Sequence, residues 1–280
     1  MARTILAPEL LFPNALCLLP KPNKCNHPDA ARLREICAKI LSMLILALDT
    51  SDARGSIALL RDTSLLCSES HVSAEDYSSW LLPAITRLLS GARVAMPDID
   101  LYAVAAGPGS FTGVRVGLTT VKAWSEVYGR PIAAVSRLEA VAAESSGSSP
   151  YVAAFIDARR DQIFAALYRR QTADLQRVDE EMVIAPDKFL EWCAARVGSD
   201  RVDWVSTDPQ CLTQTQQWSS RLTLHEAVQP VPPLLAPRIG QIGHCLAKTS
   251  QLTDALALDA NYVRRSDAEL LWKGYGHRGA

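Results

Sequence analysis

From Met43 onward, hydrophobic and polar residues follow a pattern that predicts a meander of three strands followed by helices and strands in alternation. The run at 44–48 is continuously apolar, which is typical of a strand buried on both faces. Strands are expected at 44–48, 55–61, 64–70, 101–106 and 131–135, and helices at 76–90, 113–128 and 136–144. This order predicts a mixed α/β sheet with helices packed on it.

A second set of elements follows a linker rich in serine and glycine at 145–150. Strands are expected at 151–157, 162–168, near 178–184 and at 202–206, with helices at 186–197 and 238–248. The first hairpin of this set turns through Arg159 and Arg160. Because the second set repeats the order of the first, we interpret the chain as a duplicated fold, with halves at 43–146 and 147–280 and a cleft between them.

Residues 1–42 differ from the rest, with five prolines before a short helical pattern at 29–40. We interpret them as an N-terminal extension that is disordered or that results from an assigned start codon upstream of the true one. A partner-binding tail is the alternative. Pro13 and Pro20 interrupt the apolar stretch at 10–19, and no small-residue cleavage site follows, so we expect no signal peptide.

Composition narrows the class of protein. The 280 residues are 48% hydrophobic and 21% charged, with a formal net charge of −1. A protein that binds nucleic acid unaided usually carries a basic surplus, so if tRNA is involved, another subunit is expected to supply most of the positive field. The seven cysteines contain no C-x-x-C pair, which argues against a disulfide framework or a zinc site, including one at Cys25 and His27. We therefore interpret the cysteines as reduced thiols of a cytoplasmic protein. No apolar run is long enough to cross a bilayer, so we expect no membrane contact.

The strongest local motif is GPGSFTGVRVG at 107–117, which follows a predicted strand and opens a helix. Backbone N–H groups at such a helix start can bind an anion, and glycines let a phosphate approach closely. The motif is neither a P-loop, a Rossmann fingerprint nor a nucleophile elbow, and a tight strand-to-helix turn is the simpler interpretation. The candidate anion loop, which we regard as vestigial, consists of Asp49, Thr50, Ser51, Gly107, Gly109, Ser110, Thr112 and Gly113.

This motif and five other blocks resemble the TsaB (YeaZ) family, which is related to the TsaD and M22 glycoprotease-like proteins. The blocks are ILALDTS at 45–51, LLPAI at 81–85, AVSRLEAVA at 134–142, FIDARRDQIFAALY at 155–168 and NYVRRSDAE at 261–269. They occur in the family's order over most of 43–270, although 171–260 matches loosely and 1–42 does not match. The resemblance implies an actin-like (ASKHA, ribonuclease H-like) duplicated mixed-sheet fold.

The resemblance also implies a role in tRNA threonylcarbamoyladenosine (t6A) biosynthesis. The expected function is that of a non-catalytic partner subunit of the complex that transfers threonylcarbamoyl to N6 of adenosine 37 in tRNAs reading ANN codons. The expected partners are the catalytic TsaD subunit and the TsaE-type ATPase, with tRNA bound indirectly through the complex and a homodimer as an alternative. We expect no cofactor of its own, with ATP and metal on the partner subunits.

Two positions carry the expectation that the chain is not catalytic. The catalytic paralogue has a His-x-x-x-His pair, and the corresponding residues here are Arg137 and Val141, which cannot ligate a metal. The second loop of an actin-like ATPase is glycine-rich, whereas here Asp157 is followed by Ala-Arg-Arg-Asp. The competing hypotheses are a stand-alone actin-like phosphotransferase and an M22-type metallopeptidase. His71, at a strand end, is expected to be solvated.

The helices at 76–90 and 113–128 have more apolar residues than one sheet-facing side needs. One interpretation is that the two helices cover each other within the chain. The sharper hypothesis is an exposed apolar patch that packs on a partner. Its expected residues are Trp80, Leu82, Leu89, Val114, Leu118, Val121, Trp124 and Tyr128.

Overall fold

A computed structural model describes residues 42–71, 76–172, 174–221 and 226–263 of the chain. The chain divides into two units, 1–42 and 43–280. The helical pattern expected at 29–40 lies outside the described residues, as does nearly all of the N-terminal extension.

The first sheet of the described chain has five strands in the order β3-β2-β1-β4-β5. Its strands are β1 (Leu44–Asp49), β2 (Ser56–Arg61), β3 (Ser64–Ser70), β4 (Leu101–Gly107) and β5 (Ile132–Ser136). The meander β1-β2-β3 is antiparallel, whereas β4 pairs parallel to both β1 and β5. All six residues of β1 are buried, which explains its unbroken apolar sequence.

The second sheet repeats this arrangement with the order β11-β10-β6-β7-β8, and β9 also pairs with β7. Its strands are β6 (Tyr151–Asp157), β7 (Ile163–Arg170), β8 (Leu175–Arg177), β9 (Met182–Ile184), β10 (Val202–Ser206) and β11 (Val228–Pro230). The β6-β7-β8 meander is antiparallel, and β10 pairs parallel to β6 and β11. The two sheets therefore share both strand order and strand direction.

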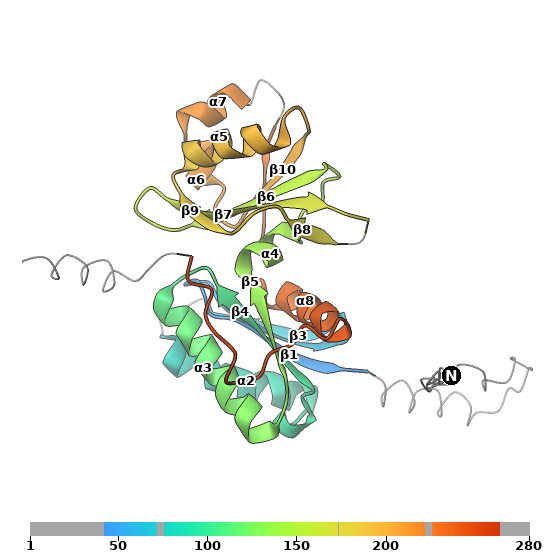
Figure 1. Cartoon of the computed structure of the whole chain (residues 1–280). Coiled ribbons are helices and arrows are strands. Elements are labelled where there is room, and N and C mark those ends of the chain that lie inside the picture. The colour runs from blue at the N-terminus through green and yellow to red at the C-terminus, as the bar shows by residue number, and fades with distance from the viewer. Residues whose placement is uncertain (1–41, 72–75, 173, 222–225, 264–280) are drawn as a thin grey trace, which may run out of the picture. The chain divides into compact units, whose positions relative to one another are not determined.

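Helices cover both faces of each sheet in the layered arrangement seen in Figure 1. On the outer face of the first sheet, α2 (Tyr77–Ala92) and α3 (Phe111–Tyr128) pack on alternate residues of β1, including Leu46 and Leu48. The intervening residues, Ile45 and Ala47, face the opposite side and a core shared with the second sheet. On the outer face of that sheet lie α5 (Pro186–Val197), α6 (Gln210–Thr213) and α7 (Gln216–Arg221).

Two further helices each pack on the sheet of the other repeat. Helix α4 (Arg137–Ala142) follows the last strand of the first sheet but packs mainly on the second. Helix α8 (Ala236–Lys248) follows the last strand of the second sheet but packs on β1, β2 and β4 of the first. The two helices contact each other within the shared core.

The sequence predicted most of these elements, and the actin-like duplicated fold class is confirmed. The prediction of a single third strand near 178–184 was wrong, because Leu175–Arg177 and Met182–Ile184 are two separate short strands that each pair with β7. The sequence did not predict β11, α6, α7 or the 3-10 turn Met96–Asp98, because each is too short to show a period. The boundary at 146/147 stays a prediction, and α8 on the first sheet shows that the halves are interleaved.

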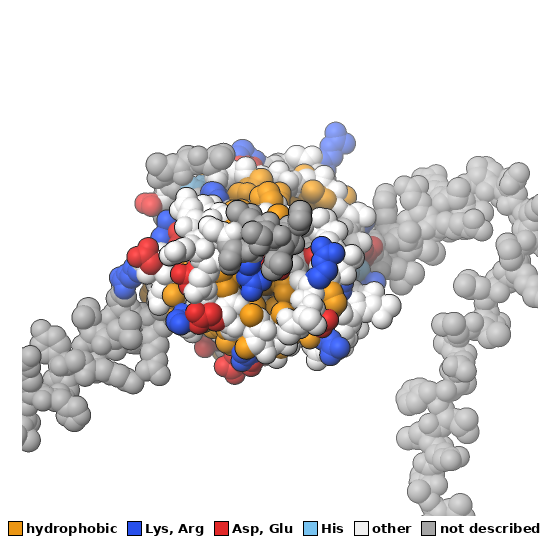
Figure 2. Space-filling view, turned by 90° about the horizontal axis from the view of Figure 1, so that it is seen from above, with side chains coloured by type: hydrophobic (Ala, Val, Ile, Leu, Met, Phe, Trp, Pro, Cys, Tyr) orange, Lys and Arg blue, Asp and Glu red, His pale blue; other side chains and the backbone are white. Residues whose placement is uncertain are grey.

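The surface agrees with the balanced composition. Figure 2 shows basic and acidic side chains interspersed over one face of the molecule, with no continuous basic area. Among the described residues, no helix combines the length and the apolar character that a membrane span requires.

Candidate functional site

The candidate site begins at Asp49, the last residue of β1, whose carboxylate is fully buried. The backbone N–H of Ser51 donates to Asp49 Oδ1 at 2.9 Å, and the Ser51 hydroxyl donates to the same oxygen. This Asx-type turn fixes the start of the loop between β1 and β2, which also carries Asp52 and Arg54.

Arg137 supplies the positive charge opposite Asp49. Its side chain, at the start of α4, is only 3% exposed. Its Nε lies 3.5 Å from Asp49 Oδ2, and its Nη2 donates to Asp52 Oδ2 at 2.9 Å. Asp49 Oδ2 and Arg137 Nε have no hydrogen-bond partner among the described residues, so charge alone pairs them. Burying either group without the other would be costly.

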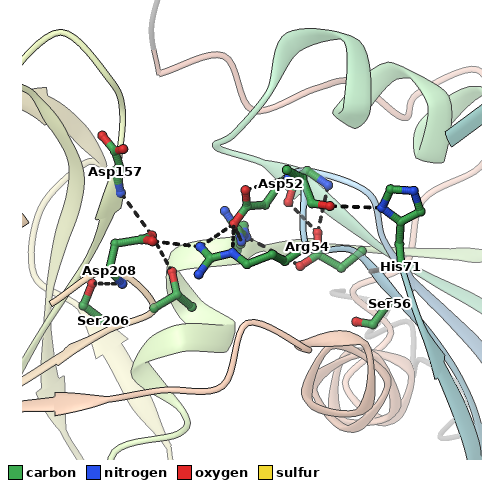
Figure 3. A network of polar contacts seen from close by, with 12 residues as sticks. Asp52, Arg54, Ser56, His71, Asp157, Ser206 and Asp208 are labelled. Carbon is green, nitrogen blue, oxygen red and sulfur yellow. Dashed lines mark hydrogen bonds and ion pairs between the residues drawn. The ribbon is translucent and has the colours of Figure 1, made fainter. Parts of the chain in front are cut away.

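Arg54 continues this network to the second sheet (Figure 3). Its Nη2 donates to Asp52 Oδ2 at 2.7 Å and to Asp208 Oδ1 at 2.8 Å. Asp208 follows β10 and accepts a hydrogen bond from the Thr207 hydroxyl at 2.8 Å. Three carboxylates and two guanidinium groups therefore alternate from Asp49 to Asp208, and we call these five residues the charge chain.

The charge chain keeps Asp52 ionised. Burial raises the pKa of this carboxyl. The charge of Arg137 and the hydrogen bonds from Arg54 and Arg137 lower the pKa by more than burial raises it, so that it falls from 3.8 to about 2. Burial also raises the pKa of the Tyr77 phenol, with the nearby charges of Asp49 and Asp52 adding to the effect. Tyr77 is therefore a neutral donor, and its hydroxyl donates to the backbone carbonyl of Asp52.

The glycine-rich motif packs directly on this turn. The Ser110 N–H donates to the Ser51 carbonyl at 2.7 Å, and the Thr50 hydroxyl donates to the Gly113 carbonyl at 2.7 Å. A Cβ at Gly109 would lie 2.2 Å from the Ser51 carbonyl oxygen, and one at Gly113 would lie 2.0 Å from that of Thr50. Close backbone packing thus explains these two glycines without a phosphate.

The structure brings the predicted anion-loop residues together, although their role in binding an anion stays a prediction. Asp49, Thr50 and Ser51 contact the motif through the bonds just described, and Ser110 caps α3 by accepting from the Gly113 N–H at 3.3 Å. Thr112 is exposed at the helix start, and Gly107 lies at the end of β4 with a φ of 110°.

A cavity of about 1290 Å³ lies beside these loops and is lined by residues of both repeats. On its second side is the β6–β7 turn, where Arg159, Arg160 and Asp161 have φ angles of 61°, 58° and 55°. Three consecutive residues other than glycine in the left-handed region are energetically unfavourable, by ~1–2 kcal/mol each. The Arg159 N–H donates to Asp157 Oδ1 at 2.7 Å, which holds the turn in place.

The residues at this site do not fit a metal. At the two positions that the resemblance predicts to correspond to the paralogue's histidines, Arg137 contacts Asp49 and Asp52, and Val141 is fully buried in the core. Within the described ranges, no group of three or more His, Cys, Asp or Glu side chains is placed to hold a metal ion.

Two features of the site were not expected. The hypothesis of a solvated His71 was wrong: the ring is 4% exposed, and its Nδ1 lies 3.0 Å from the Ala53 carbonyl oxygen. The ring packs between those of Tyr77 and Trp80, which makes it a support for the loop. Arg54 and Asp208 were missed. Asp208 follows the end of a parallel strand beside β6, where α/β folds usually place functional groups, and that was the available signal.

The predicted partner patch needs correction. Five of its eight residues are buried in the chain's own core beneath α2 and α3, because these helices cover the outer face of the first sheet. The five are Trp80, Leu89, Val114, Leu118 and Val121. Trp124 and Tyr128 are half-buried, and Leu82 is 55% exposed. A groove of about 500 Å³ remains on this side, lined by residues of α2 and α3 that include Leu82, Phe111 and Val116.

Comparisons with known proteins identify similar chains. The family model described as "TsaD: tRNA N6-adenosine threonylcarbamoyltransferase" matches residues 70–204. The tRNA threonylcarbamoyladenosine biosynthesis protein TsaB of Bacillus subtilis is 30% identical over 240 residues, covering 82% of this chain and 98% of that protein. The protein of the same name from Escherichia coli is 31% identical over 153 residues, and the match covers 52% of this chain and 64% of the Escherichia coli protein.

A solved structure gives the same result for the fold. YeaZ from Pseudomonas aeruginosa superposes with a TM-score of 0.61 at 29% identity, covering 79% of this chain and 99% of that one.

Proposed function

Because the chain belongs to the TsaB family of tRNA threonylcarbamoyladenosine biosynthesis proteins, we propose that it is a non-catalytic partner subunit of the t6A-forming complex. In this proposal the chain dimerises in the cytoplasm with a TsaD-type catalytic subunit, which transfers threonylcarbamoyl to N6 of adenosine 37 in tRNAs reading ANN codons. The TsaE-type ATPase joins the same complex. ATP and metal bind to those partners, and this chain needs neither.

The contacts of Arg137 carry the non-catalytic part of the proposal. A metal-dependent transferase needs carboxylates or histidines free to hold a cation, and an actin-like ATPase needs acidic groups that can orient one. Here the Arg137 guanidinium lies against Asp49 and Asp52, while Arg54 bridges Asp52 and Asp208. The acidic groups are therefore neutralised by the chain's own side chains.

The groove between α2 and α3 is the surface that suits a partner helix. Its lining includes the exposed Leu82 and Phe111 and the half-buried Val116, together with polar side chains such as Arg115 and Thr119. Helix-in-groove packing uses apolar residues at such positions, and one central residue often dominates the affinity. We place the TsaD-type subunit on this groove.

Co-expression with the cognate TsaD-type protein, followed by size-exclusion chromatography, tests the proposal. We expect the two chains to co-elute, and we expect the pair to restore t6A, measured by mass spectrometry of tRNA nucleosides, in a strain depleted of its own subunit. Arg137→Lys, which keeps the charge, should leave this restoration largely intact.

Two results would contradict the proposal. One is separate elution of the two chains together with failure to restore t6A. The other is steady ATP hydrolysis by this chain alone, lost in Asp49→Asn, which would favour a stand-alone phosphotransferase.

A further inference from the structure

Two motifs far apart in the sequence meet at the mouth of the cavity. Phe111 and Arg115 belong to the glycine-rich motif, and Tyr262 belongs to the final block. The rings of Phe111 and Tyr262 lie 5.4 Å apart between centroids, tilted by 32°. The Arg115 guanidinium lies 3.7 Å from the centre of the Phe111 ring, and its Nε donates to the Tyr262 hydroxyl at 2.9 Å.

These three side chains are exposed although they contact each other. Phe111 is 39% exposed and Tyr262 is 44% exposed, and neither belongs to a hydrophobic core of the described chain. The Asn261 N–H donates to the Ala106 carbonyl at 2.8 Å, and this bond fixes the segment before Tyr262. The planar groups are therefore held in place while part of their surface stays open to a ligand.

The charge of Arg115 distinguishes this cluster from other arginine–aromatic contacts in the protein. Arg196 lies 3.7 Å from the centre of the Trp192 ring, and Arg221 lies 5.3 Å from that of Trp204. Arg196 is paired with Asp179 at 2.9 Å, and Arg221 with Glu226 at 2.9 Å. Among the described residues, Arg115 forms no ion pair with a carboxylate.

We propose that Phe111, Arg115 and Tyr262 form a stacking platform for an unpaired base of single-stranded RNA, with Arg115 facing the adjoining phosphate. Bases stack on aromatic rings and on guanidinium planes, and an arginine that forms no ion pair within the described part of the chain can attract a polyanion. The choice of RNA rests on the proposed function, whereas the platform rests on the contacts above.

Fluorescence anisotropy of a labelled ten-nucleotide single-stranded RNA with the full-length chain, at low salt, tests this site. We expect Tyr262→Ala and Phe111→Ala each to weaken binding roughly fivefold or more, as loss of one stacked base does. Tyr262→Phe keeps the ring and should bind nearly as well as the unchanged protein. Arg115→Met should also weaken binding and reduce its dependence on salt.

Matched controls separate the platform from general effects. Arg196→Met removes the same charge from the other close arginine–aromatic stack, and Lys122→Met removes a charge from the same helix. Neither should change RNA affinity more than twofold. Circular dichroism of every variant checks the fold.

Several results would overturn the inference: no RNA binding by the unchanged chain, equal binding by Tyr262→Ala, or 5′-AMP binding as tightly as the RNA with the same dependence on Tyr262. Co-elution with the TsaD-type partner is measured on Tyr262→Ala, because Tyr262 does not line the groove between α2 and α3, and it should persist. Lost co-elution with unchanged RNA affinity would make the platform a protein contact and also overturn the inference. Failure of the unchanged chain to co-elute would instead count against the proposed function.

Discussion

At the scale of single residues, the charge chain pairs buried carboxylates with arginine side chains of the same chain. Asp49 is fully buried, and Arg137 is its cationic partner there. Asp52 is shared between Arg137 and Arg54, which differ sharply in exposure, at 3% and 42% of their side-chain surfaces. The two arginines should therefore contribute very differently to stability.

We predict that Arg137→Met lowers the free energy of unfolding by about 3–5 kcal/mol, because it leaves Asp49 buried without a counter-charge. Arg54→Met is the matched control and should cost about 1 kcal/mol or less, since Arg54 is partly solvated. Urea denaturation of both variants measures the difference. Equal losses of unfolding free energy in the two variants would show that the buried Asp49–Arg137 pair contributes no more to stability than the contacts of Arg54.

The lowered pKa of Asp52 predicts how stability changes in acid. Its pKa of about 2 in the folded chain lies below the usual 3.8, so ionised Asp52 stabilises the fold at pH values above 3.8. This contribution is lost as the pH falls from 3.8 toward 2. In Asp52→Asn, the loss of unfolding free energy between about pH 5 and about pH 2.5 should be smaller than in the unchanged protein.

Glu126→Gln, which removes one exposed carboxylate from α3, controls for the change in net charge. If the free energy of unfolding falls by the same amount in Asp52→Asn and in the unchanged protein as the pH is lowered, Asp52 does not contribute to the pH dependence.

At the scale of secondary-structure elements, α8 depends on two glycines where it crosses the first sheet. A Cβ at Gly243 would lie 2.8 Å from the Ala103 Cβ, an atom fixed to the backbone of the sheet. A Cβ at Gly240 would lie 2.4 Å from Leu60 Cδ1, which is the end of a flexible side chain. The same added methyl group thus meets two different obstacles on one helix.

Gly243→Ala should destabilise the protein by about 1–3 kcal/mol, because the helix must move away from the sheet. Gly240→Ala should cost less, since Leu60 can change rotamer and alanine favours a helix by up to ~1 kcal/mol over glycine. Thermal unfolding of the two variants compares them directly. The reverse order would show that α8 does not rest on Ala103.

The groove between α2 and α3 gives a prediction about partner binding. Leu82→Glu should reduce affinity for the TsaD-type subunit by about tenfold or more, because a charge would be buried against the partner helix. The fold should be retained, since Leu82 is 55% exposed. Leu256→Glu, which makes the same change at a position 90% exposed in a loop, is the control. Titration calorimetry measures both, and unchanged affinity in Leu82→Glu would place the partner elsewhere.

Trp124→Ala tests another residue of the predicted partner patch, which lies outside the lining of the groove, and carries a different expectation. Trp124 is half-buried and packs near Tyr102 at 5.6 Å between ring centroids, so truncation should lower stability as well as affinity.

Much of the fold could be predicted from sequence because long apolar runs and caps carry local signals. The continuous apolar run of β1 was predicted in this way. Strand β11 was not, because three residues cannot establish a period. The site was predictable only in part: the sequence indicates Asp49 and the glycine motif, whereas the approach of Arg54 to Asp208 depends on tertiary packing.

At the scale of the whole molecule, the packed body starts where the apolar pattern starts. The Met43 N–H donates to Asp62 Oδ1 at 2.9 Å, and the Leu44 N–H donates to Asp100 Oδ2 at 2.8 Å. We predict that deletion of residues 1–42 changes the melting temperature by only a few degrees and still restores t6A in a depleted strain. A large drop in melting temperature, measured by calorimetry, would show that the extension contributes to the fold.

The exchange of α4 and α8 has a consequence for how the protein is made. Helix α8, near the end of the described chain, covers the inner face of the first sheet, so that sheet leaves the ribosome long before its cover does. Helix α4 is synthesised before the sheet on which it packs. The first repeat therefore cannot complete its core before α8 has been synthesised, although domains usually fold one after another as they emerge. The nascent chain should depend on chaperones until residue 248 has been added, and messages truncated before α8 should yield insoluble protein.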